Sequence, residues 1–206
     1  MKQYARIVLL GTALAVTASM LGFYGISATS FGLAQPASIT SYAPMMGHVT
    51  LTVYDADGNI KAYRQTDNTI VDEGDNCMSG QVFDLTSGAS CSNGAQKFDI
   101  LAIGSGGGAC ASQPAETVTA LTTEITTPAR GNATTAVLTA ASGGSSASVQ
   151  LQRAFAFTST LTVDEAGVLN SASTTADQML AAQCFSDINV VSGDSLTVTW
   201  TFTVGP

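Results

Sequence analysis

The sequence predicts a mainly β protein: an antiparallel β-sandwich, immunoglobulin-like or jelly-roll-like, with one short helix, preceded by an N-terminal hydrophobic signal or anchor helix. Three observations predict this fold. Only 11% of the residues are charged, so few i,i+4 charge pairs can support exposed helices. Threonine and valine, which favour strands, are abundant. Several short segments alternate apolar and polar residues and are separated by turn residues, as in β-sandwiches.

Residues 1–34 have the composition of an export signal. Lys2 and Arg6 precede the uncharged and mostly apolar stretch 7–33, and a basic start followed by an apolar stretch is typical of secretion. Small residues predict cleavage after Ala34. An uncleaved anchor is the alternative, because the stretch is long enough to span a bilayer of about 30 Å. We therefore expect an extracellular or cell-surface protein that contacts membrane only through this segment, if it is retained.

Residues 35–47 are uncharged and contain Pro36 and Pro44, so they are expected to form an extended arm or linker. The β-domain is then expected to comprise residues 48–206. Its first strand is predicted at 48–54, where residues alternate with a period of two. The apolar face of that strand consists of Val49, Leu51 and Val53.

Two interpretations of this first strand remain open. Turn residues at 55–59 and a partner segment at 60–65 predict a hairpin within the chain. Alternatively, residues 38–53 are an arm that adds a strand to the sheet of a neighbouring copy. The inserted face would then be Val49, Leu51 and Val53.

The turn after this strand also offers weak candidates for a metal site. Asp55, Asp57 and Asn59 have the alternate spacing of the first ligands in a calcium loop. The EF-hand pattern requires glycine at its sixth position and glutamate at its twelfth, where this chain has Ile60 and Thr66. A hairpin turn is therefore the preferred interpretation, and no metal or other cofactor is expected.

One helix and several further strands are expected in the middle of the chain. The helix is predicted at 71–85, because acidic residues lie near its start, where the helix dipole favours them. A nearly continuous apolar run at 98–103 predicts a strand covered on both faces. Other strands are expected at 118–125, 134–140 and 149–157.

The C-terminal segment carries the clearest strand pattern. Its apolar residues alternate with serine and threonine, which predicts one core face and one solvent-facing ladder. A tight turn at 192–194 connects this strand to an expected strand at 183–191. The apolar set is Leu196, Val198, Trp200, Phe202 and Val204.

Four cysteines follow the export segment, and an even number in an oxidising compartment predicts two disulfides. Three pairings are possible. The preferred one joins Cys77 to Cys91, which closes a short loop, and Cys110 to Cys184. A zinc site is the rival interpretation, but the chain has no C-x-x-C motif and only one histidine.

The sequence favours no catalytic chemistry, so we expect a protein that is not an enzyme. A Ser–His–Asp triad would have to use His48, which is expected at the surface. Asp164 and Glu165 are the most suggestive carboxylate pair for glycoside hydrolysis, but a turn before Gly167 is the preferred interpretation. The loop at 104–109 fits G-x-G-x-x-A, but no helix is expected after it to receive a pyrophosphate.

The net charge limits the partners that the chain can bind, and one motif marks a candidate modification site. The chain has 15 acidic and 7 basic side chains and a net charge of −8, which argues against nucleic acid because that partner requires clustered cations. Asn132 begins an N-x-T sequon and is a candidate for glycosylation.

Three blocks carry a resemblance to known families: TDNTIVDEGDNCM, then FDILAIGSG before LTTEI, then DEAGVLN followed by MLAAQCFSDINVVSGDSLTVTWTFTV. Their order resembles secreted β-rich proteins of archaea and small β-domains of phage tail appendages. In outline, a signal peptide, an arm and a β-sandwich are similar to archaeal thread-like pili. The resemblance implies surface display, adhesion or assembly into an appendage, and it supplies no catalytic residues.

The expected function is that of a non-enzymatic extracellular structural protein, a surface filament or pilus subunit or an adhesin. It is expected to self-associate, with strand complementation as the suggested mode. The alternative is a monomeric cell-envelope module that binds carbohydrate or calcium.

Overall fold

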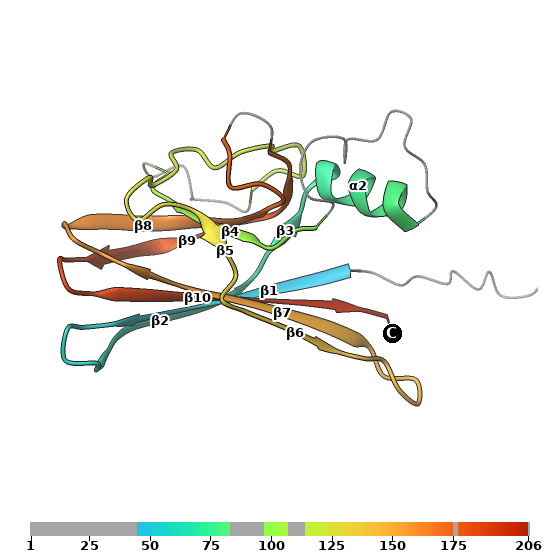
Figure 1. Cartoon of the computed structure of the whole chain (residues 1–206), viewed down its shortest axis with the longest axis horizontal. Helices are drawn as coiled ribbons and strands as arrows, with labels where there is room; N and C mark the ends of the chain where they lie inside the picture. Colours follow the sequence, from blue (N-terminus) through green and yellow to red (C-terminus); the bar gives the residue numbers. More distant parts are fainter. Residues whose placement is uncertain (1–44, 83–96, 107–113, 175–176, 206) are drawn as a thin grey trace, which may run out of the picture. The chain divides into compact units, whose positions relative to one another are not determined.

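The computed structural model describes residues 45–82, 97–106, 114–174 and 177–205, which lie in a unit beginning at Ala43. The described residues form ten strands and one helix (Figure 1). In chain order these are β1 (Met45–Tyr54), β2 (Ile60–Asp67), β3 (Thr69–Ile70), α2 (Asp72–Val82), β4 (Ile100–Gly104), β5 (Gly131–Asn132), β6 (Thr135–Thr139), β7 (Ala147–Ala156), β8 (Leu161–Leu169), β9 (Met179–Val190) and β10 (Ser195–Val204).

The strands form two antiparallel sheets. The first sheet has the order β2-β1-β10-β7-β6, and the second has the order β3-β9-β8-β4-β5. In the first sheet β10 lies between β1 and β7, so the strands that begin and end the domain are direct neighbours. The prediction of a mainly β protein with antiparallel sheets and one short helix is confirmed.

The apolar faces of the alternating strands form the core. Val49, Leu51 and Val53 are fully buried, and their partners across the ladder are Trp200, Val198 and Leu196. One cluster of buried side chains includes these residues together with residues of β4, β8 and β9 from the second sheet. The two sheets therefore share one core, and the strict alternation of β1 and β10 follows from burial of one face only.

The second sheet is also buried on its other face. A separate cluster there contains Ile100, Ala102, Leu169 and Met179, and Val118 and Leu121 pack against it. The segment that carries these last two residues thus covers the sheet on the side away from the main core. This double coverage explains why β4 is buried along its whole length and reads as a continuous apolar run.

Several boundaries differ from the prediction. β1 begins at Met45 instead of residue 48, because its ladder with β10 continues to the pair Met45 and Val204. The expected strand at 118–125 is wrong. These residues belong to the segment that covers the second sheet, which we call the covering segment, and their ladder contact is an isolated bridge between Gly104 and Glu124.

The expected N-terminal helix and residues 35–44 of the expected arm lie outside the described residues. Among the residues that are described, no helix is both long enough and apolar enough to cross a bilayer.

The turn between β9 and β10 gives a prediction about acid stability. Asp194 is 3% exposed and accepts hydrogen bonds from Lys61 Nζ at 2.6 Å and Val191 N at 2.9 Å. The Lys61 ammonium and this backbone N–H hold the pKa of Asp194 below its ordinary value. Because the folded pKa is the lower one, the carboxylate stabilises the fold above the unfolded pKa of about 3.9 and loses this effect as the pH falls further.

We therefore expect Asp194→Asn to lower the Tm at pH 7. The difference from the unsubstituted protein should shrink as the pH falls below about 4, where the carboxylate becomes protonated. Thermal unfolding followed by circular dichroism from pH 2 to 8 measures this. Asp57→Asn, at the exposed tip of the β1–β2 hairpin, is the matched control. Equal Tm losses for Asp194→Asn at all pH values would contradict the prediction.

Candidate functional site

The four edge strands of the two sheets differ in length and charge. In the second sheet the edges β3 and β5 have two residues each, too short to template another strand. In the first sheet β2 has eight residues but includes Lys61, Arg64 and Asp67. The other edge, β6, has five residues, Thr-Ala-Val-Leu-Thr, without charge or proline. Charges and short length are the usual protection of sheet edges, and β6 lacks the charges.

Strand β6 is exposed on both faces. It pairs with β7 on one side and is the last strand of its sheet on the other, and all five of its residues are exposed. Val137 is 49% exposed and Leu138 is 69% exposed. Because successive strand residues point to opposite faces, the edge carries an apolar side chain on each face. We call this strand with its unpaired side the β6 edge.

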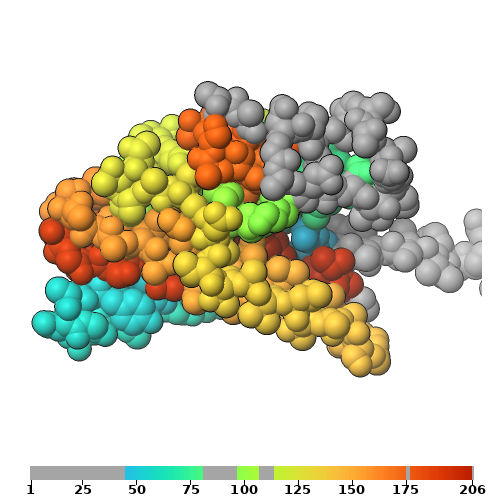
Figure 2. Space-filling model, viewed as in Figure 1, coloured from blue at the N-terminus to red at the C-terminus, as the bar shows by residue number. Residues whose placement is uncertain are grey.

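The apolar surface continues from the β6 edge onto neighbouring strands. Leu138 pairs with Val149, which in turn pairs with Phe202, so the three lie in one row on the core-facing side of the sheet. Phe202 is 2% exposed, whereas Val149 is 36% exposed. The core face is therefore covered at β10 and becomes exposed towards β6. In Figure 2 the β6–β7 hairpin, yellow to orange, forms the lower right surface of the domain.

The residues predicted as an assembly strand lie elsewhere. Val49, Leu51 and Val53 are in β1, which pairs with β2 on one side and β10 on the other within its own chain. This is the arrangement of the hairpin interpretation. Donation of this strand to another copy would require its removal from between β2 and β10. A strand added to this sheet would instead pair with one of its edges, and the β6 edge is the uncharged one.

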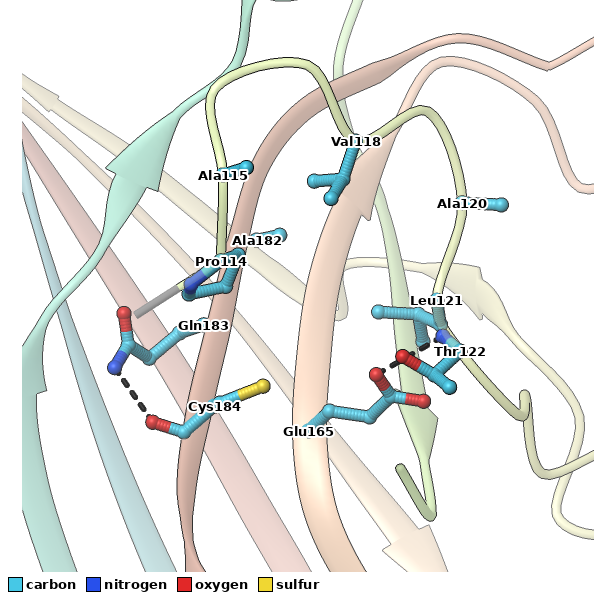
Figure 3. Close-up of a pocket in the computed structure, with 10 residues that line it drawn as sticks. All are labelled: Pro114, Ala115, Val118, Ala120, Leu121, Thr122, Glu165, Ala182, Gln183 and Cys184. Atoms are coloured by element: carbon cyan, nitrogen blue, oxygen red, sulfur yellow. Dashed lines mark hydrogen bonds between the residues drawn. The ribbon is translucent and has the colours of Figure 1, made fainter. Parts of the chain in front are cut away.

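A small cavity lies on the outer side of the second sheet. It has a volume of about 210 Å³ and lies between β8 and β9 and the covering segment. Figure 3 shows Glu165 and Cys184 on the strands and Val118 and Leu121 opposite them. The full lining is Pro114, Ala115, Val118, Ala120, Leu121, Thr122, Glu165, Ala182, Gln183 and Cys184.

The carboxylate in this cavity anchors the covering segment. Glu165 is 3% exposed and accepts hydrogen bonds from the backbone N–H groups of Thr122 at 3.0 Å and Thr123 at 2.8 Å. A Cβ at Gly104 would lie 2.4 Å from Glu165 Oε1 and 2.7 Å from the Thr123 carbonyl oxygen. Glycine at position 104 therefore permits the close approach of strand, carboxylate and segment.

The predicted turn at Asp164 and Glu165 is wrong, because both residues lie within β8. Asp164 is also buried and accepts a hydrogen bond from the backbone N–H of Gly106. Each carboxylate thus binds backbone donors from a different loop. This arrangement holds loops onto the sheet, and it gives no support to paired acid–base catalysis at these two residues.

The weak metal candidates form a hairpin turn. Asp55 Oδ1 accepts hydrogen bonds from the backbone N–H groups of Asp57 at 3.0 Å and Asn59 at 2.8 Å. These bonds lower the pKa of Asp55, with the Asn59 backbone as the largest cause. Within the described ranges no three His, Cys, Asp or Glu side chains are grouped as metal ligands.

His48 lies beside Asp67 across the hairpin. Its Nδ1 is 3.0 Å from Asp67 Oδ1, and its Nε2 is buried without a hydrogen-bond partner among the described residues. A triad requires a nucleophile hydrogen-bonded to that second nitrogen, so this pair forms no triad with any of the described residues.

The remaining predicted sites are cysteines and a sequon. Cys77 and Cys184 each take part in a disulfide. Cys91 and Cys110 lie outside the described residues, so the preferred pairing stays a prediction. Asn132 is exposed on β5, and its Nδ2 donates to Asp99 Oδ2 at 3.3 Å; its glycosylation also stays a prediction.

Sequence reasoning missed the β6 edge, although it predicted the strand. The available signal was the absence of charge at 134–140, but local sequence does not reveal which strand lies at an edge. Comparison of the chain with models of protein families, with curated proteins and with solved structures finds no match.

Proposed function

We propose that this chain is an extracellular structural protein, a surface appendage subunit or adhesin, that assembles by pairing of sheet edges. The observation that carries the proposal is the β6 edge: it is uncharged, has exposed apolar side chains on both faces, and lies beside a partly uncovered core face. An open edge of this kind is a template for another strand. Two sheets around one core also fit a β-sandwich of the immunoglobulin-like or jelly-roll-like kind.

The scaffold supports a mechanical role. Buried carboxylates are hydrogen-bonded to loop backbone, and the disulfide-bonded Cys77 and Cys184 suit an oxidising compartment. Together with the export signal predicted at 1–34, these features favour a rigid domain displayed outside the cytoplasm. In this proposal the β6 edge receives a strand, and β1 keeps its place in its own sheet.

The proposal predicts that lysine at the β6 edge abolishes association. We expect the full chain, kept in mild detergent because residues 7–33 are apolar, to form oligomers as its concentration rises. Val137→Lys with Leu138→Lys should leave it monomeric, because inserted charges oppose strand addition. Sedimentation velocity and electron microscopy measure assembly.

The matched control is Ile60→Lys, an apolar residue that is 65% exposed on the opposite edge β2. Both variants should keep the Tm of the unsubstituted protein, since the replaced side chains are exposed. Oligomers that persist in the β6 double variant would refute assembly through this edge.

The cavity beside Glu165 favours the second candidate function, a monomeric envelope module that binds a small ligand. A chain that stays monomeric at every concentration, without filaments, would support this candidate over the first. Its cavity is small, and its one acidic side chain already accepts two backbone hydrogen bonds. Calcium needs six to eight oxygen ligands, so a calcium-dependent Tm would have to involve other groups.

A further inference from the structure

We propose that the partner of the β6 edge is the β6 edge of a second copy, paired antiparallel about a twofold axis at Val137. This inference rests on the proposed function and names the partner at the same surface. It would join the first sheets of two copies into one continuous sheet. The reasons are the self-complementary sequence of the strand, the distribution of charge around it, and the protection of the other edges.

The sequence of β6 is complementary to itself in the antiparallel direction. With Val137 opposite its own copy, Leu138 lies opposite Ala136, and Thr135 lies opposite Thr139. Residues directly opposite in an antiparallel pair point to the same face. Each large leucine therefore lies beside a small alanine on the core-facing side, and the two valines meet between threonines on the other side. An interface between identical patches generates a closed twofold dimer.

Charge also favours this surface for contact between copies. The chain carries a net charge of −8, yet residues 125–163 contain no aspartate or glutamate. The two cations in this stretch have partners within the chain: Arg130 binds Glu124, and Arg153 donates to the carbonyl oxygen of Asn132 at 2.8 Å. The carboxylate of Asp99, which lies next to Asn132, is ion-paired with Lys97 at 2.6 Å. Two acidic molecules that approach through this stretch therefore bring together none of its own carboxylates, which lowers the repulsion between them.

The other edge of the same sheet is a poorer partner. Lys61 and Arg64 on β2 would have to lie against an uncharged strand, where desolvation of a cation without a partner is unfavourable. A five-residue edge buries less than the roughly 800 Å² per partner of a stable interface. Association is therefore expected to be weak and concentration-dependent in solution, and stronger between copies held close together.

Site-specific photocrosslinking of the full chain tests the pairing. A benzophenone-bearing amino acid is placed at Val137, and in a second variant at Thr139, which would lie opposite Thr135 of the other copy. After irradiation, trypsin should release residues 131–153 as one peptide, because Arg130 and Arg153 flank it. We expect a covalent dimer in which two copies of this peptide are joined, and its yield should rise with protein concentration.

The control places the same group at Tyr63, which is 51% exposed on β2, and should give no dimer. Joining of 131–153 to the peptide 7–61 of another copy would overturn self-pairing and show arm donation to the same edge, leaving the proposed function in place. If neither the Val137 variant nor the Thr139 variant gave a dimer, both proposals would be overturned. Equal dimer yields from β6 and Tyr63 would also overturn self-pairing. Unchanged circular dichroism melts of each variant establish that it is folded.

Discussion

Replacement of Trp200 by alanine is expected to cost about 4 kcal/mol of unfolding free energy, near the range for large aromatic side chains in cores. Trp200 is fully buried in the core shared by the two sheets. It stacks on Phe202 with ring centroids 5.9 Å apart, and it lies opposite Val49 in the ladder. The cavity left by this substitution would adjoin both sheets. Urea unfolding followed by far-ultraviolet circular dichroism measures the loss.

Trp200→Phe is the control that separates the loss of core packing from the loss of the buried indole N–H. The indole Nε1 is buried and has no hydrogen-bond partner within the described part of the chain. Phenylalanine removes this unsatisfied N–H while keeping a stacked ring, so we expect a smaller loss, about 1 kcal/mol. If Trp200→Ala unfolded at the same urea concentration as Trp200→Phe, the assigned role of tryptophan in core packing would be wrong.

Arg130→Ala is expected to destabilise the protein by about 3 kcal/mol, because it leaves two partly buried carboxylates without their cation. The Arg130 side chain is 7% exposed, and those of Glu124 and Asp177 are 16% and 15% exposed. Arg130 Nε donates to Glu124 at 2.7 Å, while its Nη1 and Nη2 bind Asp177 and Glu124. The Glu124 hydrogen bonds, followed by those of Asp177, raise the pKa of Arg130, so it stays charged.

Arg130→Lys tests the geometry of this ion-pair network. Lysine keeps the charge but cannot form the planar fork that binds two oxygens of Glu124, so an intermediate loss is expected. Arg64→Ala removes an exposed arginine of β2 and should leave stability nearly unchanged. Chemical unfolding at low and high salt compares the three. An Arg130→Ala loss no larger than that of Arg64→Ala would contradict the proposed network.

Local periodicity predicted the strands whose environment repeats every two residues. β1 and β10 are buried on one face and open on the other, so alternation of residue type marks nearly their whole length. The expected helix at 71–85 corresponds to α2 at Asp72–Val82, where acidic residues fill the first turn. In these segments the order of residue types carries the signal by itself, although β1 and β10 pair across nearly the whole length of the domain.

The features that the sequence did not predict depend on contacts between residues that are far apart in the chain. The position of Glu165 just before Gly167 predicts a turn, whereas in the structure this acidic residue is buried within a strand, which is uncommon. Its hydrogen-bond donors lie 42 and 43 residues earlier in the chain. The segment 118–125 has a strand-like composition because Val118 and Leu121 cover the second sheet, and its residues have little ladder to join. Whether a strand lies at the edge of a sheet likewise depends on the order of the strands in that sheet, which local sequence does not show.

The pairing of Met45 with Val204 has a consequence for how the domain bears load. The chain enters and leaves through the same end of two adjacent antiparallel strands. A force that separates these two termini would open the β1–β10 ladder one bond at a time, which offers less resistance than shearing all its bonds together. The domain is therefore expected to open more easily when it is pulled through its two ends than a domain whose terminal strands would be sheared past each other.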